Sequence, residues 1–100
     1  MGTRKHKAIH PGEVLKHDFM RPMGVTAYRL AKDTGATAQH IGRVLHGQRG
    51  IGADLALRLA HYFGTSAELW MTLQAKYDLE TAEDRAGREI EKRVKPHRAA

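Results

Sequence analysis

The sequence predicts an all-α protein, a compact domain of five short helices followed by a short basic C-terminal extension. Two observations lead to this prediction. Apolar residues recur at the i, i+3 and i+4 spacing of amphipathic helices, and no segment alternates as a half-buried strand would. In addition, Ala27–His46 has the pattern of a helix-turn-helix. A chain of 100 residues, 41% of them hydrophobic, is sized for one domain with a modest core.

The first helix is expected to begin at Pro11, because a proline at the first helical position loses no hydrogen bond. Its apolar face consists of Val14, Leu15, Phe19 and Met20. Pro22 and Gly24 should end it. Residues 1–8 precede the helix as a basic arm that we expect to be flexible. The basic residues of this arm are Arg4, Lys5 and Lys7.

The helix-turn-helix prediction depends on four positions. Ala31 is small where the two helices would cross, and Gly35 can adopt the positive φ that a tight turn requires. Ile41 and Val44 give the second helix an apolar stripe at helical spacing. The opposite side of that helix is therefore left open.

Capping residues and glycines predict the remaining helix ends. The expected N-capping residues are Thr26, Thr37, and Thr65 or Ser66. Gly47 and Gly64 are expected to end the third and fourth helices. The fourth helix should cover about Ala53 to Phe63, and the fifth should follow Ser66.

The second helix of the motif is predicted to read DNA bases. The candidate base-reading residues are Thr37, Ala38, Gln39, His40 and Arg43. Gln39 can bond adenine in a bidentate manner, Arg43 can do the same with guanine, and the Ala38 methyl can touch thymine. The alternative interpretation is that these residues form an ordinary solvated helix face.

Four residues near the motif are predicted to contact DNA phosphates. They are Tyr28, Arg29, Gln48 and Arg49. The first two open the second helix, and the others lie in the glycine-rich loop Gly47–Gly52. Two alternatives stay open: the loop is only a flexible connector, and Arg29 pairs with Asp33 at i, i+4.

The fifth helix is predicted to form a two-fold dimer interface. Its candidate interface residues are Trp70, Leu73 and Tyr77, because aromatic residues are enriched at such surfaces. The alternative is that they belong to the core. The domain proper is expected to cover residues 9–80, and residues 81–100 to form a charged extension, either a marginal helix or disordered.

Charge and composition narrow the classes of function. The net charge of +6 and the isoelectric point near 10.0 favour a polyanionic partner such as DNA. No cysteine, signal-like segment or membrane-length apolar run is present, so we expect a cytoplasmic protein without a membrane partner. The seven histidines have no cysteine partners, and no catalytic or nucleotide-binding motif occurs. We therefore expect no metal, cofactor or small-molecule ligand, and no enzymatic activity.

Four segments in order resemble the HigA antitoxin family, also called VapI-type plasmid-maintenance antidotes, within the Cro/repressor-type helix-turn-helix proteins. They are IHPGEVL, YRLAKDTG, HGQRGI with DLALRLAHYFGTS (which includes Arg58), and ELWMTLQAKYDLE. The resemblance covers about Ile9 to Glu80. Gly52 departs from the pattern, since similar sequences carry threonine or serine there.

The resemblance implies a function with three parts. It implies a homodimer formed through the C-terminal helices, binding to double-stranded operator DNA upstream of the chain's own operon, and neutralisation of a RelE-like HigB-type toxin that cleaves mRNA. It also implies the base-reading role of the third helix and a phosphate contact by Arg49. The alternatives are a stand-alone helix-turn-helix regulator without a toxin, or an interaction module that has kept only the fold.

Overall fold

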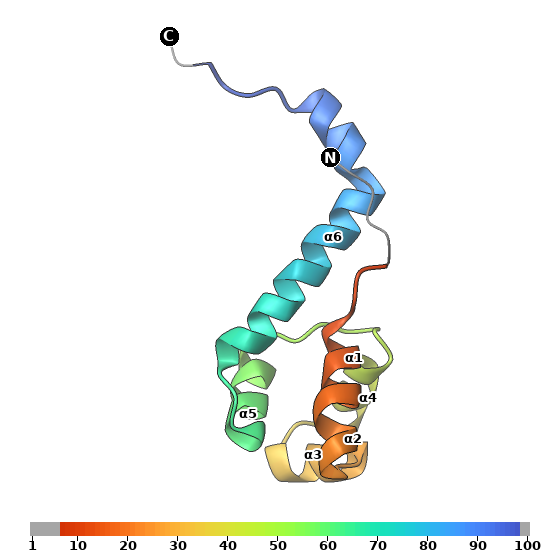
Figure 1. The fold of residues 1–100 in the computed structure, drawn as a ribbon, viewed down its shortest axis with the longest axis vertical. Helices are drawn as coiled ribbons and strands as arrows, with labels where there is room; N and C mark the ends of the chain where they lie inside the picture. Colours follow the sequence, from red (N-terminus) through yellow and green to blue (C-terminus); the bar gives the residue numbers. More distant parts are fainter. Residues whose placement is uncertain (1–6, 99–100) are drawn as a thin grey trace.

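The computed structural model describes residues 7–98, which form helices and no strand, as the all-α prediction requires (Figure 1). Residues 1–6, with Arg4 and Lys5 of the basic arm, lie outside the described residues. The elements are α1 (Pro11–Val14), η1 (Leu15–Met20, a π-helical turn), α2 (Arg21–Met23), α3 (Ala27–Thr34), α4 (Ala38–Leu45), α5 (Ala53–Phe63) and α6 (Ala67–Arg93). The first three follow one another without a break, so the chain has the five expected helical units.

Pro22 and Gly24 were expected to end the N-terminal helical unit; the unit runs through Pro22 and ends at Gly24. The backbone N–H of Arg21 bonds to the carbonyl of Lys16, five residues back, which is the wider spacing of a π-helix. This wider turn accommodates a proline that has no N–H to donate. Gly24 ends the unit as expected, and its φ of +67° is in the left-handed region.

One cluster of apolar side chains forms the core, and every helical unit contributes to it. Its buried members are Leu15, Met20, Leu30, Ala31, Ile41, Val44, Ile51, Leu55, Ala56, Leu59 and Trp70. The four positions that predicted the helix-turn-helix contribute three of these residues. Core packing therefore holds α3 and α4 by one side each, which leaves their other sides at the surface.

Trp70 lies in this core, which favours the alternative that it is a core residue over the predicted dimer interface. Its side chain is 0% exposed. Its ring packs 5.0 Å from the ring of Phe19, and its Nε1 donates to Oγ1 of Thr65 at 2.9 Å. Phe19, from the N-terminal helical unit, covers the Trp70 ring and allows it to be buried. Tyr62 is only half-buried, so it does not compete for the same space in the core. An indole that is fully covered within one chain offers no surface to a second copy.

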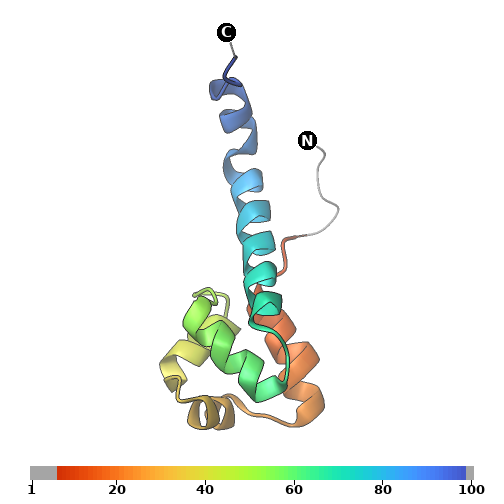
Figure 2. The same cartoon turned by 90° about the vertical axis from the view of Figure 1, so that its left-hand side faces the viewer.

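α6 continues past the expected domain boundary at residue 80 as one helix of 27 residues (Figures 1 and 2). The boundary therefore falls inside a helix, and no separate sixth helix forms in the described residues. Ion pairs at i, i+4 between Lys76 and Glu80 and between Glu89 and Arg93 support the helical course. The helix ends at Arg93, where the chain becomes extended ahead of Pro96.

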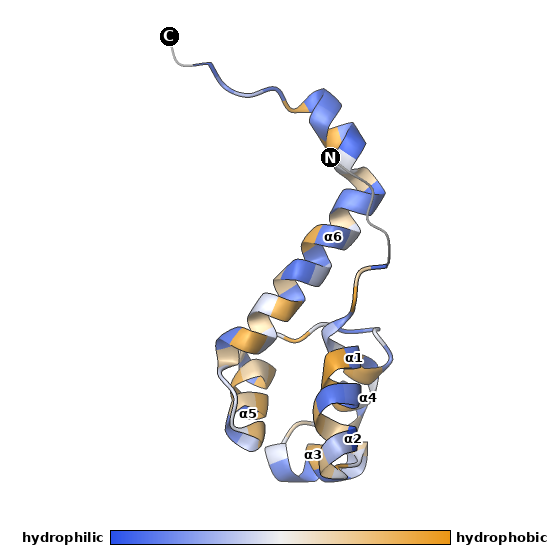
Figure 3. Cartoon of the chain, viewed as in Figure 1, coloured by the Kyte–Doolittle hydropathy of each residue, from blue (hydrophilic) through white to orange (hydrophobic). Residues whose placement is uncertain are grey.

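The two halves of α6 have different surroundings. The first half packs against α5, whereas the second half projects away from the rest of the domain (Figure 2). Most of this projecting half is hydrophilic, with isolated apolar residues along it (Figure 3). Leu79 and Ile90 are among them, with 66% and 52% of their surface exposed.

Candidate nucleic-acid interface

The turn between α3 and α4 has the geometry of a helix-turn-helix, which confirms that prediction. Gly35 ends α3 with a φ of +79°, which favours glycine. Oγ1 of Thr37 accepts a hydrogen bond from the backbone N–H of His40 at 3.0 Å and so caps α4. Nη1 of Arg58 donates to the carbonyl of Thr34 at 2.7 Å, satisfying a carbonyl at the end of α3. Local caps and one side chain of α5 thus fix the turn.

α4 buries one side and presents the other to solvent. Ile41 and Val44 are 0% exposed and anchor the helix in the core. Of the five predicted base-reading residues, His40 is half-buried and the other four are exposed; these are Thr37, Ala38, Gln39 and Arg43. The structure therefore gathers these residues on one helix and its N-cap, with four side chains open to solvent.

A histidine near DNA adds positive charge only when its ring is protonated, so the surroundings of His40 matter. Partial burial lowers the pKa of His40, and the nearby positive charge of Arg49 lowers it further, against the opposing effect of Asp54. His40 therefore takes up a proton at a lower pH than an ordinary histidine does. Nδ1 of His46 lies 2.7 Å from the carbonyl oxygen of Gly42, within the last turn of α4.

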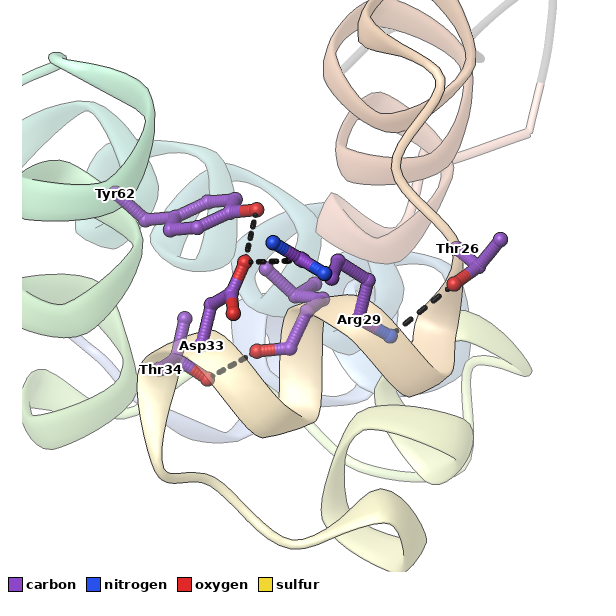
Figure 4. A network of polar contacts seen from close by, with 6 residues as sticks. Thr26, Arg29, Asp33, Thr34 and Tyr62 are labelled. Carbon is purple, nitrogen blue, oxygen red and sulfur yellow. Dashed lines mark hydrogen bonds and ion pairs between the residues drawn. The ribbon is translucent and has the colours of Figure 1, made fainter.

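Tyr28 and Arg29 lie at the start of α3, and their environments differ. Tyr28 is 73% exposed. Nε of Arg29 donates to Oδ2 of Asp33 at 2.9 Å, and the hydroxyl of Tyr62 donates to the same oxygen at 2.8 Å (Figure 4). The hydrogen bond from Tyr62, and to a smaller extent that from Arg29, holds the pKa of Asp33 below its ordinary value. The alternative pairing of Arg29 with Asp33 is thus present in the structure.

Hydrogen bonds at the ends of α3 complete this network (Figure 4). Oγ1 of Thr26 accepts from the backbone N–H of Arg29 at 3.1 Å, as expected of an N-cap. Oγ1 of Thr34 donates to the carbonyl of Leu30 at 2.6 Å. The guanidinium of Arg29 is therefore held on a helix that is itself capped at its start.

Gln48 and Arg49 are exposed on the loop that follows α4. The loop starts from a glycine cap, in which Gly47 has a φ of +72° and the N–H of Gln48 bonds to the carbonyl of Arg43 at 2.8 Å. At its other end, the N–H of Ile51 donates to Oε1 of Gln74 at 2.7 Å. The loop is thus anchored at both ends, which argues against the flexible-connector alternative.

The sequence prediction assigned no role to Gln74 or His10, although both contact this loop. Gln74 reaches Ile51 across 23 residues of sequence, and no local spacing signals such a contact. Nδ1 of His10 accepts from the N–H of Gly12 at 2.9 Å and caps α1. The position of His10 directly before Pro11 could have indicated the cap, but not the contact with the loop.

The other predicted interface residues of α6 remain partly accessible. Leu73 and Tyr77 are half-buried. The ring of Tyr77 meets the ring of His10 edge-on, with 4.8 Å between centroids and an interplanar angle of 71°. Part of the surface of Tyr77 is therefore covered by a contact within its own chain. The more exposed apolar residues of this stretch are Met71 and Leu79.

Within residues 7–98, no three histidine or carboxylate side chains are grouped as a metal site would require. None of the helices there combines the length and the hydropathy needed to cross a bilayer.

The chain is similar to several known proteins over most of its length, although no protein-family model matches it. Virulence-associated protein I of Dichelobacter nodosus is 45% identical over 82 residues, which are 82% of this chain and 76% of that protein. Antitoxin HigA-1 of Vibrio cholerae is 32% identical over 96 residues, covering 96% and 90%. The solved structure of Pseudomonas aeruginosa antitoxin HigA with the higBA promoter has a TM-score of 0.87 at 40% identity, covering 90% of this chain and 98% of that chain.

Proposed function

Because the chain belongs to the HigA antitoxin family, we propose that it is an operator-binding repressor that also neutralises a toxin, and not an enzyme. The observation that carries the DNA-binding role is the open side of α4, where Gln39 and Arg43 are exposed on a helix anchored by its other side. The Pseudomonas HigA structure contains promoter DNA, which supports this role. Under this proposal the protein works in the cytoplasm, where its operator is.

In the proposed complex, α4 lies in a major groove about 12 Å wide. Gln39 would bond adenine and Arg43 guanine, each through two hydrogen bonds, and the Ala38 methyl would contact thymine. Oγ1 of Thr37 accepts one hydrogen bond at the N-cap of α4, so its O–H group can still donate to a partner in the groove. His40 is half-buried, and its lowered pKa favours the neutral ring, which can both donate and accept a hydrogen bond.

Phosphate contacts would orient α4 on the duplex. Arg49 is exposed and lies close enough to His40 for its charge to lower the pKa of that ring, so the loop and α4 face the same region. Gln48 and Tyr28 are exposed on the same motif. Arg29 would reach a phosphate only by sharing or leaving its pairing with Asp33. We therefore rank Arg49 first among the phosphate contacts.

A homodimer would place two copies of α4 about 34 Å apart on a palindromic operator. The proposed contact surface is α6, with the half-buried Leu73 and Tyr77 and the exposed Leu79. Trp70 is no longer part of it, because the core of one chain already covers its indole. A RelE-like HigB-type toxin is the expected protein partner by family.

Binding of promoter DNA tests the first half of this proposal. A duplex from the region upstream of the chain's own gene should bind at least about a thousandfold more tightly than a random duplex at the same salt concentration. Fluorescence anisotropy over a range of salt concentrations measures both affinities. Equal affinities for the two duplexes would contradict operator recognition and leave only non-specific DNA binding.

Co-purification with the product of the adjacent gene tests the second half. A tagged copy of this chain, expressed together with a neighbouring small basic reading frame, should retain that product through size-exclusion chromatography. The same product expressed alone should cleave mRNA on ribosomes and arrest growth. Operator binding without any such partner would favour the stand-alone regulator instead.

A further inference from the structure

The loop that carries Gln48 and Arg49 is held by side chains from two distant elements. From α6, Oε1 of Gln74 accepts a hydrogen bond from the backbone N–H of Ile51 at 2.7 Å. Nε2 of the same amide donates to Oδ1 of Asp78 at 2.9 Å. Both ends of the Gln74 amide are therefore engaged, so its orientation is fixed and its oxygen faces the loop.

Gly50 allows Gln74 to lie directly against the loop backbone. A Cβ atom built at Gly50 would come within 2.9 Å of the amide carbon, nitrogen and oxygen of Gln74. Distances this short are not found for real Cβ atoms, so any larger residue at Gly50 would push the Gln74 amide away. The glycine is needed here for close approach rather than for an unusual φ.

His10 holds the loop from the opposite direction. Its Nδ1 accepts from the N–H of Gly12 at 2.9 Å, and its ring lies beside Gly47, where a Cβ atom would be 3.9 Å from the ring carbons. The backbone of Arg49 is near enough to this ring to raise its pKa against the larger effect of burial. The same ring packs edge-on against Tyr77 of α6. The loop is thus in contact with the residue that caps α1 and, through a ring contact, is linked to α6.

We propose that Gln74 and His10 are positioning residues for DNA binding: they hold the Gly47–Gly52 loop so that Arg49 meets a phosphate while α4 lies in the groove. This inference rests on the proposed operator binding. Gln74 is the main support, because it joins α6 to the loop by a direct hydrogen bond between a side chain and an N–H group. An unanchored loop would have to be ordered on binding, which would weaken the complex. The arrangement also links α6, the proposed dimer helix, to the surface that contacts DNA.

Gln74→Met tests the role of the amide. Methionine has a similar length and helix propensity but cannot accept from Ile51. We expect affinity for the promoter duplex to fall about tenfold, and the slope of log K against log salt to become shallower by about one, the value of one lost phosphate contact. Arg49→Ala should have little further effect in this background, because both changes remove the same contact.

Two further variants separate positioning from general damage. The double variant Gln74→Glu, Asp78→Asn exchanges the two functional groups without changing the net charge, and it should restore the slope and most of the affinity. Gly50→Ala leaves α6 untouched and displaces the amide, so it should reproduce the effect of Gln74→Met. Circular dichroism confirms that each variant folds, and exchange of the Ile51 amide with deuterium should be faster in Gln74→Met.

The outcomes distinguish this inference from the proposed function. If Arg49→Ala alone leaves the salt slope unchanged, the phosphate contact of Arg49 fails and this inference fails with it. If Arg49→Ala changes the slope but Gln74→Met and Gly50→Ala do not, only the positioning role is overturned. The role is also overturned if Gln74→Met and Arg49→Ala reduce affinity additively.

Discussion

Arg29 and Arg43 face the same DNA in the proposed complex, yet their neighbours constrain them differently. Arg29 already pairs with Asp33, whose carboxylate is also held by Tyr62. An exposed pair of this kind contributes little to stability, so a phosphate can compete for the guanidinium. Arg43 extends from the open side of α4 and is exposed, so its contribution to binding depends on the bases it meets.

We expect Arg43→Ala to weaken binding to the promoter duplex by about 1–3 kcal/mol and to leave binding to random DNA nearly unchanged. The reason is that a bidentate contact with a base is lost, whereas a phosphate contact is not. Anisotropy titrations with both duplexes measure the difference. Arg88→Ala removes the same charge from the exposed far half of α6 and is the matched control. An equal loss on both duplexes would show that Arg43 does not read bases.

His10 should make the stability of the domain depend on pH. Burial is the largest effect on its pKa and lowers it below the ordinary value of 6.5, so the unfolded chain binds a proton more readily than the folded one. The stabilising contribution is therefore complete above about pH 6.5 and is lost as the pH falls through 6.5 toward the lower pKa of the folded state. The pKa of His40 is lowered too and adds to the same trend.

His10→Asn isolates this contribution, because asparagine is a good N-cap that does not titrate. Urea unfolding at pH 7.5 and at pH 5.5 should show a smaller difference in the free energy of unfolding for the variant than for the wild type. The remaining difference reports His40 and the other titratable groups. An identical pH dependence in the two proteins would remove His10 as a source of it.

At the scale of single elements, sequence predicts best where the cause is local. The cap by Thr37 and the left-handed turn at Gly35 involve residues within three positions of each other, and both are found as expected. Gly24 ends the first helix as expected, but the helical course through Pro22 was missed, because a π-helical turn has no simple sequence signal. The length of α6 was underestimated, because Gly87 weakens a helix on average by only about 1 kcal/mol, which neighbouring ion pairs offset.

Contacts between distant segments account for the remaining differences between the sequence prediction and the structure. Trp70 is buried because Phe19, fifty-one residues earlier, packs against its ring. Gln74 reaches the loop across 23 residues of sequence. Neither contact follows from a helical repeat, which describes only the residues on one helix. The residues of α4 were predictable because their exposure follows from the apolar stripe of that same helix.

The packing of α1 against α4 provides a test with a matched control. A Cβ atom at Gly12 would collide with the backbone carbonyl of Val44, whereas one at Gly42 would have nothing within 4 Å. We expect Gly12→Ala to destabilise the fold by about 1–3 kcal/mol through overpacking. Gly42→Ala should stabilise it by about 0.5–1 kcal/mol, because alanine loses less backbone entropy within a helix. Chemical denaturation of both variants measures these changes, and the same sign for both would contradict the packing described.

At the scale of the whole molecule, the chain is a small helical body with a long helix leaving it. The principal extents are 55 × 30 × 21 Å, and the far half of α6 accounts for the long dimension (Figure 2). The core is complete within one chain. We therefore expect the body to fold without a partner, while the exposed apolar residues on α6 favour association.

Trp70→Ala and Leu79→Glu should separate folding from association. Removing the buried indole should cost about 3–5 kcal/mol, a large part of the stability of so small a domain, so helical content should melt at a lower temperature. Leu79→Glu changes a residue that is 66% exposed and should leave melting of the body nearly unchanged. In sedimentation, Leu79→Glu should shift the protein toward monomer. A folded monomer produced by Trp70→Ala would instead return Trp70 to the interface.

The unbroken length of α6 has a consequence for the spacing of the operator half-sites that a dimer can bind. A helix of 27 residues is a rod about 40 Å long. In the proposed dimer, two such helices join the DNA-reading bodies. The angle at which the helices cross therefore sets the distance between the two copies of α4. A tilt of roughly 5° over about 40 Å moves one body by about 3.5 Å, close to the 3.4 Å between successive bases on a strand. Single substitutions along α6, far from any base, would then change the half-site spacing that the dimer accepts.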